Sequence, residues 1–154
     1  MTDPHLAAIL SEARASIERD EGCREVAYPD PLSGGEPWTI GYGQTGPDII
    51  EGTVWTFAEC DAALTAALNE LVASLDVKLP WWRDLDAPRA AVLVEMAYQM
   101  GVAGLLGFTS MLREAERGNW LAASADMLIS RWADETPERA SRLAAQMRTG
   151  VIAQ

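Results

Sequence analysis

Histidine and cysteine are scarce in this chain of 154 residues, which has one histidine and two cysteines. A structural zinc site needs four such ligands, so His5, Cys23 and Cys60 cannot form one. A catalytic Cys–His pair would need His5, which stands near the chain terminus, where chains commonly fray. We therefore expect neither a metal nor a cofactor. Free thiols in a reducing compartment are the simplest interpretation of the cysteines, with a Cys23–Cys60 bridge as the alternative.

Basic residues are also few. The chain has 12 Lys and Arg against 23 Asp and Glu, a formal net charge of −11. Because affinity for phosphate backbones comes mainly from Lys and Arg, this balance excludes a nucleic-acid partner.

Long apolar runs are absent too. No run approaches the roughly 20 residues that cross a membrane, and the apolar residues 6–10 are too few for a secretory signal. We expect no membrane insertion and synthesis in the cytoplasm without a signal peptide. Apolar residues still make up 49% of the chain, which is enough to build the core of one folded domain.

The spacing of the apolar residues predicts an α+β domain. A first helix should run from about Leu6 to Gly22, since glycine suits the position after a helix. From Trp38 to Gly43 large and small residues alternate, as in a strand. The remaining pattern is helical, with N-caps expected from Thr56, Asp86 and Thr136 and helices expected at 56–76, 86–101, 109–117, 119–132 and 137–148.

The predicted strand has one open face. Thr39, Gly41 and Gly43 point to that face, opposite the large side chains, and two glycines there leave room for a ligand. Among the tryptophans, Trp81 and Trp82 beside Pro80 are the best candidates for exposed rings that stack on sugars.

Glu21 and Asp30 are candidates for a catalytic pair of carboxyl groups. Glu21 ends a helix, where the partial negative charge of the helix dipole disfavours ionisation, so it suits a general acid. Asp30 lies between Pro29 and Pro31, which push its backbone toward an extended geometry, and it suits an ionised partner. One protonated and one ionised carboxyl group are what cleavage of a glycosidic bond requires.

The motifs around these residues resemble the phage-type lysozymes, glycoside hydrolase family 24. The resemblance rests on D-E-G at 20–22, A-Y-P-D at 27–30 and W-T-I-G-Y-G at 38–43, and it extends in the family's order from residue 17 to residue 150. It implies one lysozyme-like domain over residues 1–154. A small catalytic lobe with a short β-sheet would span about 17–55, a linking helix and a larger helical lobe about 56–150, and the active-site cleft would lie between the lobes.

The resemblance also implies roles for individual residues. Glu21 would be the general acid, while Asp30 and Thr39 would hold and activate the attacking water. The reaction would be hydrolysis, with inversion, of the β-1,4 bond between N-acetylmuramic acid and N-acetylglucosamine. Gln44 stands where the family commonly has histidine. The positions expected to contact substrate are Tyr28, Gly41, Gln44, Phe108 and Arg148.

The implied protein is an endolysin, a bacteriolytic glycosidase that degrades cell-wall peptidoglycan during phage lysis of the host. It would act in the periplasm as a monomer after a holin-type pore releases it. One alternative is a non-catalytic peptidoglycan-binding component of a virion or secretion apparatus with the same fold. Another is a peptidoglycan amidase or peptidase, which the shortage of Cys and His disfavours. A lytic transglycosylase would differ in leaving anhydro-muramic ends.

Overall fold

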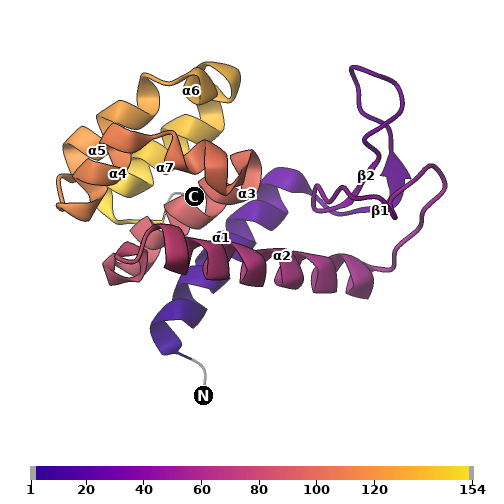
Figure 1. Cartoon of the computed structure of the whole chain (residues 1–154), viewed down its shortest axis with the longest axis horizontal. Helices are drawn as coiled ribbons and strands as arrows, with labels where there is room; N and C mark the ends of the chain where they lie inside the picture. Colours follow the sequence, from indigo (N-terminus) through magenta and orange to yellow (C-terminus); the bar gives the residue numbers. More distant parts are fainter. Residues whose placement is uncertain (1–2, 153–154) are drawn as a thin grey trace. The chain divides into compact units, whose positions relative to one another are not determined.

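The computed structural model describes residues 3–152 and divides them into two compact units, which we describe separately (Figure 1). The β unit is Arg14–Glu70, and the helical unit comprises the remaining described residues. The chain is α+β, as predicted. A long N-terminal helix is followed by a two-stranded antiparallel sheet and then by a larger helical region.

Helix α1 (Pro4–Glu21) ends where its sequence predicts. Gly22 follows with φ +66°, and its backbone N–H donates to the Glu18 carbonyl at 3.0 Å. This left-handed conformation is one that glycine adopts without steric cost, so Gly22 stops the helix directly after Glu21.

The sheet pairs β1 (Arg24–Tyr28) with β2 (Thr39–Gly41). The strand expected at 38–43 is shorter than predicted, because Gly41 and Gly43 have φ of +64° and +88° and turn the chain back on itself. The turn is closed by two backbone hydrogen bonds of 2.9 and 2.8 Å between Ile40 and Gln44. Ile40 is fully buried in the core of this unit, which contains Ala27, Ile40 and Ile49 with Trp38 and Trp55 packed against them.

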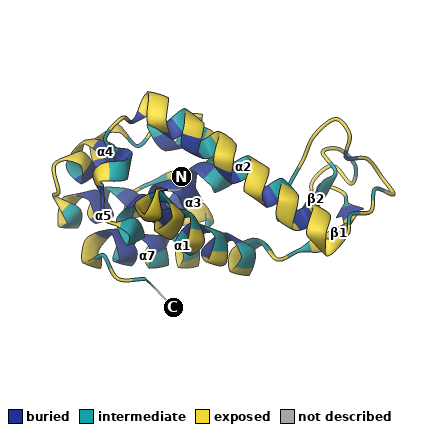
Figure 2. Ribbon diagram, turned by 90° about the horizontal axis from the view of Figure 1, so that it is seen from below, coloured by how far each residue is buried: buried dark blue, intermediate teal, exposed yellow. Residues whose placement is uncertain are grey.

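Helix α2 (Phe57–Lys78) begins with the predicted capping box. The Glu59 N–H donates to Thr56 Oγ1, and the Thr56 N–H donates to Glu59 Oε1, both at 3.1 Å. In Figure 2 exposed and buried residues alternate along α2, as expected of a helix with one apolar face. Within the β unit, Arg14 Nη1 of α1 donates to Asp61 Oδ1 of α2 at 3.0 Å, so this ion pair helps to hold the two helices together.

The helical unit is built around α3 (Ala87–Leu106), whose residues 90–97 are all buried. The predicted end at Gly101 is instead a kink with φ +81°, after which the helix continues to Leu106. The other elements are the 3₁₀ helix η1 (Trp82–Asp84), α4 (Thr109–Glu116), α5 (Trp120–Leu128), α6 (Arg131–Glu135) and α7 (Pro137–Thr149). Helix α7 packs against α3, α5 and α6, and α4 packs against α5.

One predicted helix is wrong in extent. The segment expected as a single helix over 119–132 forms α5 and α6, separated at Ile129 and Ser130. The reason is a capping interaction that apolar periodicity does not reveal, since Ser130 Oγ accepts from the Ala133 N–H at 3.1 Å and starts a new helix.

Two predicted N-caps are also wrong in detail. Asp86 and Thr136 occupy the positions before α3 and α7, but neither side chain accepts a hydrogen bond from a backbone N–H of its helix. Asp86 Oδ1 instead accepts from Arg89 Nη1 at 3.2 Å, and Thr136 Oγ1 donates to the Trp132 carbonyl at 3.0 Å. In both cases a nearby partner competes with the backbone for the capping oxygen.

The expected exposure of Trp82 is wrong. Its ring is fully buried, and its Nε1–H donates to Asp76 Oδ1 at 2.8 Å. Arg83 binds the same carboxylate with two hydrogen bonds of 2.8 and 2.7 Å, which lower the pKa of Asp76 below its usual range. Only Trp81 of this pair stays half-exposed.

No single helix among residues 3–152 has both the length and the apolar character to cross a membrane. Helices α3 and α4 pass that test only when taken together, and they are bent by 103° at the break between them.

Glu12 of α1 gives a prediction about stability. Its Oε2 is buried and has no hydrogen-bond partner within the described residues, and burial, followed by the charge of Asp86, raises the pKa of this carboxyl. When folding raises the pKa of a carboxyl group, the folded protein becomes less stable relative to the unfolded chain as the pH rises and this group ionises. We therefore expect Glu12→Gln to raise the free energy of unfolding by about 1 kcal/mol at neutral pH.

The advantage should disappear below about pH 4, where Glu12 is also protonated in the wild type. Urea unfolding of wild type and Glu12→Gln, at neutral pH and below about pH 4, measures this difference in the free energy of unfolding. Exposed Glu70 provides the control. An equal gain from Glu70→Gln would show that reduced net charge, and not the burial of Glu12, is responsible.

Candidate active site

The Glu21 carboxylate lies against the turn that follows β2. A Cβ built on Gly43 would lie 3.3 Å from Glu21 Oε2 and 3.7 Å from Glu21 Cδ. Gly43 also has φ +88°, a conformation that favours glycine. Residue 43 has no side chain to stand between them, so the turn lies directly against the half-buried carboxylate. This contact joins the D-E-G and G-Y-G motifs, which are about 20 residues apart in the sequence.

Thr39 is the first residue of β2 and is paired with Tyr28, the last residue of β1. Both side chains are half-buried, and the Arg24 guanidinium lies 4.6 Å from the centre of the Tyr28 ring. The pairing places the Thr39 backbone at the end of β1 that leads into Asp30.

Asp30 is held in a tight turn by its own hydrogen bonds. Its Oδ2 accepts from the Ser33 N–H at 3.1 Å, its N–H donates to the Gly35 carbonyl at 2.9 Å, and its carbonyl accepts from the Gly34 N–H at 2.8 Å. Sequence reasoning attributed the fixed position of Asp30 to the flanking prolines and missed this turn. The signal for it was the Asp-x-x-Ser-Gly-Gly pattern, which is typical of Asx turns.

The chemistry of this carboxylate follows from its two oxygens. Oδ2 is occupied by the turn, whereas Oδ1 makes no hydrogen bond within residues 3–152. Asp30 is half-buried. An anchored carboxylate with one free oxygen can hold a water molecule in a fixed direction.

The open face predicted for the strand is wrong at Gly41. This residue is buried, and a Cβ there would lie 3.1 Å from Cζ3 of Trp55. The space left by the missing side chain is therefore filled by the Trp55 ring. Gln44 is half-buried in the same turn as Gly43, and its backbone closes that turn on Ile40.

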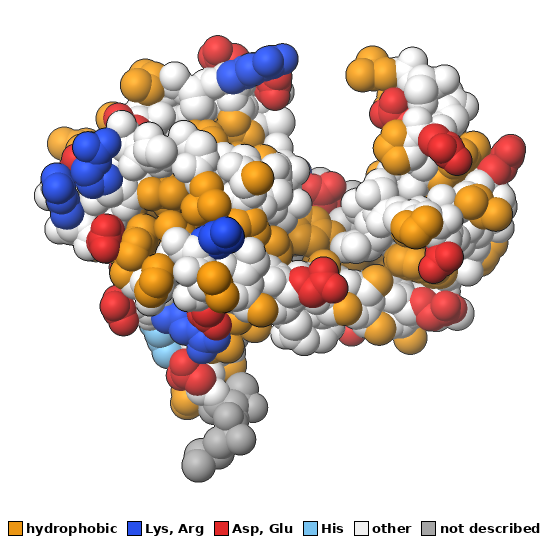
Figure 3. All heavy atoms as spheres, in the orientation of Figure 1, with side chains coloured by type: hydrophobic (Ala, Val, Ile, Leu, Met, Phe, Trp, Pro, Cys, Tyr) orange, Lys and Arg blue, Asp and Glu red, His pale blue; other side chains and the backbone are white. Residues whose placement is uncertain are grey.

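The β unit is strongly acidic. It contains eleven Asp and Glu against three arginines. Two of the arginines are engaged, Arg14 with Asp61 and Arg24 with the Tyr28 ring. On the face drawn in Figure 3, red acidic side chains but no blue basic ones are visible around the two strands. Such a surface repels anionic ligands at long range, so binding of an anionic ligand would have to come from direct contacts within the site.

A hollow of about 430 Å³ lies beside Trp38, the residue before Thr39. It is lined by residues 36–38, 45–47 and 49, with Glu36 and Thr45 as polar groups. Sequence reasoning did not identify this hollow, because its walls come from two loops with no periodic pattern.

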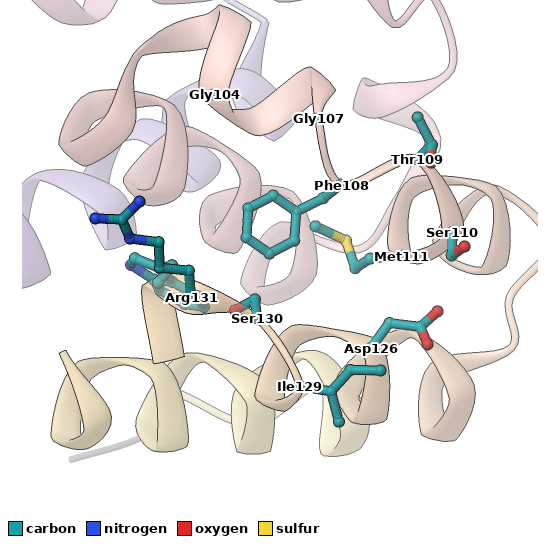
Figure 4. A pocket seen from close by; sticks show the side chains of 11 residues that line it. Gly104, Gly107, Phe108, Thr109, Ser110, Met111, Asp126, Ile129, Ser130 and Arg131 are labelled. Atoms are coloured by element: carbon teal, nitrogen blue, oxygen red, sulfur yellow. The ribbon is translucent and has the colours of Figure 1, made fainter. Parts of the chain in front are cut away.

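Phe108 lies in the helical unit, in a pocket of about 460 Å³ (Figure 4). Its ring meets that of Trp132 edge-on, with centroids 6.0 Å apart. Asp126 and Arg131 add charges of opposite sign to the lining, and Thr109 and Ser110 add hydroxyl groups. The sequence indicated Phe108 but not Asp126 or Arg131.

Arg148 is exposed near the end of α7, also in the helical unit. Its carbonyl accepts from Arg89 Nη2 at 2.9 Å. Among residues 3–152, no group of three or more His, Cys, Asp or Glu side chains is arranged to hold a metal ion.

Comparison with known proteins gives consistent matches. Residues 18–148 match the sequence profile of the family described as Phage lysozyme. Probable T4-type lysozyme 1 of Dictyostelium discoideum is 32% identical over 71 residues, which are 46% of this chain and 42% of that protein. The SAR-endolysin of Enterobacteria phage P21 is 27% identical over 128 residues, 82% of this chain and 72% of that protein.

A third relative is named as a spike protein and not as a lysozyme or endolysin. The pre-baseplate central spike protein Gp5 of Enterobacteria phage T4 is 37% identical over 71 residues, 46% of this chain and 12% of that protein. The chain thus matches less than half the length of the T4-type lysozyme and a small part of the spike protein.

Proposed function

The chain belongs to the phage lysozyme family, and from that premise we propose that it is a muramidase of the endolysin type. Its reaction is hydrolysis of the β-1,4 bond between N-acetylmuramic acid and N-acetylglucosamine in peptidoglycan, with inversion. The observation that carries the proposal is the contact of Glu21 with the Gly43 turn, because it joins two motifs of the matched region around one carboxylate.

Glu21 is assigned the role of general acid, which protonates the leaving oxygen of the glycosidic bond. Its half-buried position against the Gly43 turn supports this role, because a general acid must be held at a fixed place beside the bond that it protonates. Asp30 is assigned the role of base. Its free Oδ1 supports this role, since an inverting enzyme must hold a water molecule for attack on the opposite face of the sugar. Thr39 supplies a hydroxyl group for the same water.

Substrate contacts are assigned to Tyr28 and Gln44 in the β unit and to Phe108 and Arg148 in the helical unit. For Phe108 the supporting observation is its place in a pocket that offers an aromatic face and both signs of charge. At Gly41 only the backbone is available, because the Trp55 ring fills the side-chain space.

We propose that the protein acts on the bacterial cell wall as a monomer with a single lysozyme domain. Two release routes are open to test. The sequence suggested a holin-type pore, whereas the relatives named SAR-endolysin suggest a different release mechanism.

A second candidate function is that of a virion component that binds peptidoglycan. The specific observation in its favour is the similarity to a central spike protein, which is 37% identical over the matched residues. The presence of Glu21, Asp30 and Thr39 together favours the catalytic proposal, since a binding role needs none of them.

Product analysis distinguishes these possibilities. We expect the purified protein to release fragments with muramic-acid reducing ends from peptidoglycan, detected by mass spectrometry, and NMR of the first product to show the α anomer. Anhydro-muramic ends would indicate a lytic transglycosylase, a β anomer would contradict inversion, and binding without cleavage would favour the virion component.

A further inference from the structure

Cys23 and Cys60 form a thiol pair that the proposed hydrolysis does not use. Cys23 lies between Gly22, which ends α1, and the first residue of β1, and Cys60 lies in the first turn of α2. Both are free thiols in this structure. They are 37 positions apart in the sequence, yet the fold brings the two side chains close enough for the thiols to interact.

The fold holds these two side chains in place from several sides. Cys60 Sγ lies 3.8 Å from the carbonyl oxygen of Arg24, the neighbour of Cys23. Cys60 Cβ lies 3.7 Å from where a Cβ of Gly41 would be, and Gly41 is paired with Arg24 across the sheet. Cys60 is thus fixed beside the backbone segment that carries Cys23.

The two thiols differ in accessibility. Cys60 is fully buried, whereas Cys23 is partly exposed. Burial, followed by the hydrogen bond from Cys23, raises the pKa of the Cys60 thiol to about 11. The Tyr42 hydroxyl interacts with Cys23, and the negative charge of Glu25 adds to the rise in the pKa of Cys60. A disulfide reagent therefore meets Cys23 first.

We propose that Cys23 and Cys60 are a site of covalent modification, at which a disulfide oxidant crosslinks the end of α1 to the first turn of α2. In the first step, the Cys23 thiolate attacks one sulfur of the oxidant, the S–S bond of the oxidant breaks, and one half leaves as a thiolate. In the second step, the Cys60 thiolate attacks Cys23 Sγ, and the second half leaves. The protein loses two electrons and two protons, and the oxidant becomes two thiols.

This proposal does not depend on the muramidase activity, and its test reads mass and stability. The full-length protein is incubated with oxidised glutathione at mildly alkaline pH, where more thiolate is present. We expect the mass to fall by two hydrogen atoms, with no glutathione retained, and a proteolytic peptide to link Cys23 to Cys60. The closed loop should raise the midpoint of thermal unfolding by about 10 °C, reversibly on reduction.

Single substitutions test the order of the steps. Cys60→Ser should accumulate one glutathione on Cys23, because the second thiol is missing. Cys23→Ser should stay unmodified, because Cys60 is buried. Wild-type protein that retains one or two glutathiones, forms intermolecular dimers or does not react would overturn the proposal. The wild-type mass decides the question even where a variant folds poorly.

Discussion

Replacing Glu21 by glutamine should lower the rate of peptidoglycan hydrolysis by about 100-fold or more, with little change in stability. The substitution removes the proton that the leaving oxygen needs, and a lost general acid costs on the order of 10²–10⁴ in rate, or about 3 kcal/mol at the lower bound. Glutamine has nearly the same shape as glutamate, so it keeps the packing against Gly43.

Initial rates of reducing-end release, with the midpoint of urea unfolding for each variant, measure this effect. The matched control is Glu25→Gln, which removes one negative charge from an exposed position on β1. Because the β unit is acidic, a change in net charge alone alters binding to an anionic wall, and the control isolates that effect. Equal activity in wild type and Glu21→Gln would remove Glu21 from the mechanism.

Asp30→Asn is expected to reduce activity by a similar factor, about 100-fold, while leaving the turn intact. Asparagine keeps an oxygen that accepts from the Ser33 N–H, but it lacks the charge needed to activate water. Asp30→Ala should lose the same activity and, in addition, about 1 kcal/mol of stability, because the Ser33 N–H loses its acceptor.

The comparison of these two variants separates chemistry from positioning. If Asp30 served only to shape the turn, Asn would retain nearly full activity and only Ala would be impaired. Steady-state rates and urea unfolding of both variants therefore decide between a catalytic and a structural role. The expected pattern is two inactive enzymes, of which only the Ala variant is less stable.

The sequence was informative where local patterns decide the structure. Gly22 stops α1, the Thr56 and Glu59 box starts α2, and the apolar run at residues 90–97 becomes the buried helix α3. These features depend on residues within one or two turns of each other, so spacing alone predicts them.

It was less informative where partners come from distant parts of the chain. Alternation predicted an open face at Gly41, but the ring that fills it belongs to Trp55, which no local pattern links to the strand. Trp82 was expected to be exposed, but Asp76 gives its indole nitrogen a buried partner. The roles proposed for Glu21, Asp30 and Thr39 rest mainly on the family resemblance, since a chain with 23 acidic residues offers many carboxylate pairs.

The helical unit is interrupted in sequence, because residues 14–70 separate its first segment from the rest. His5 Nε2 and the Leu85 carbonyl oxygen, for example, are 2.8 Å apart, although 80 positions separate them in the chain. During synthesis, the start of α1 leaves the ribosome long before its packing partners exist, while the β unit already has its own core. Co-translational folding should therefore begin with the β unit, and the first turns of α1 should wait exposed until the C-terminal helices emerge.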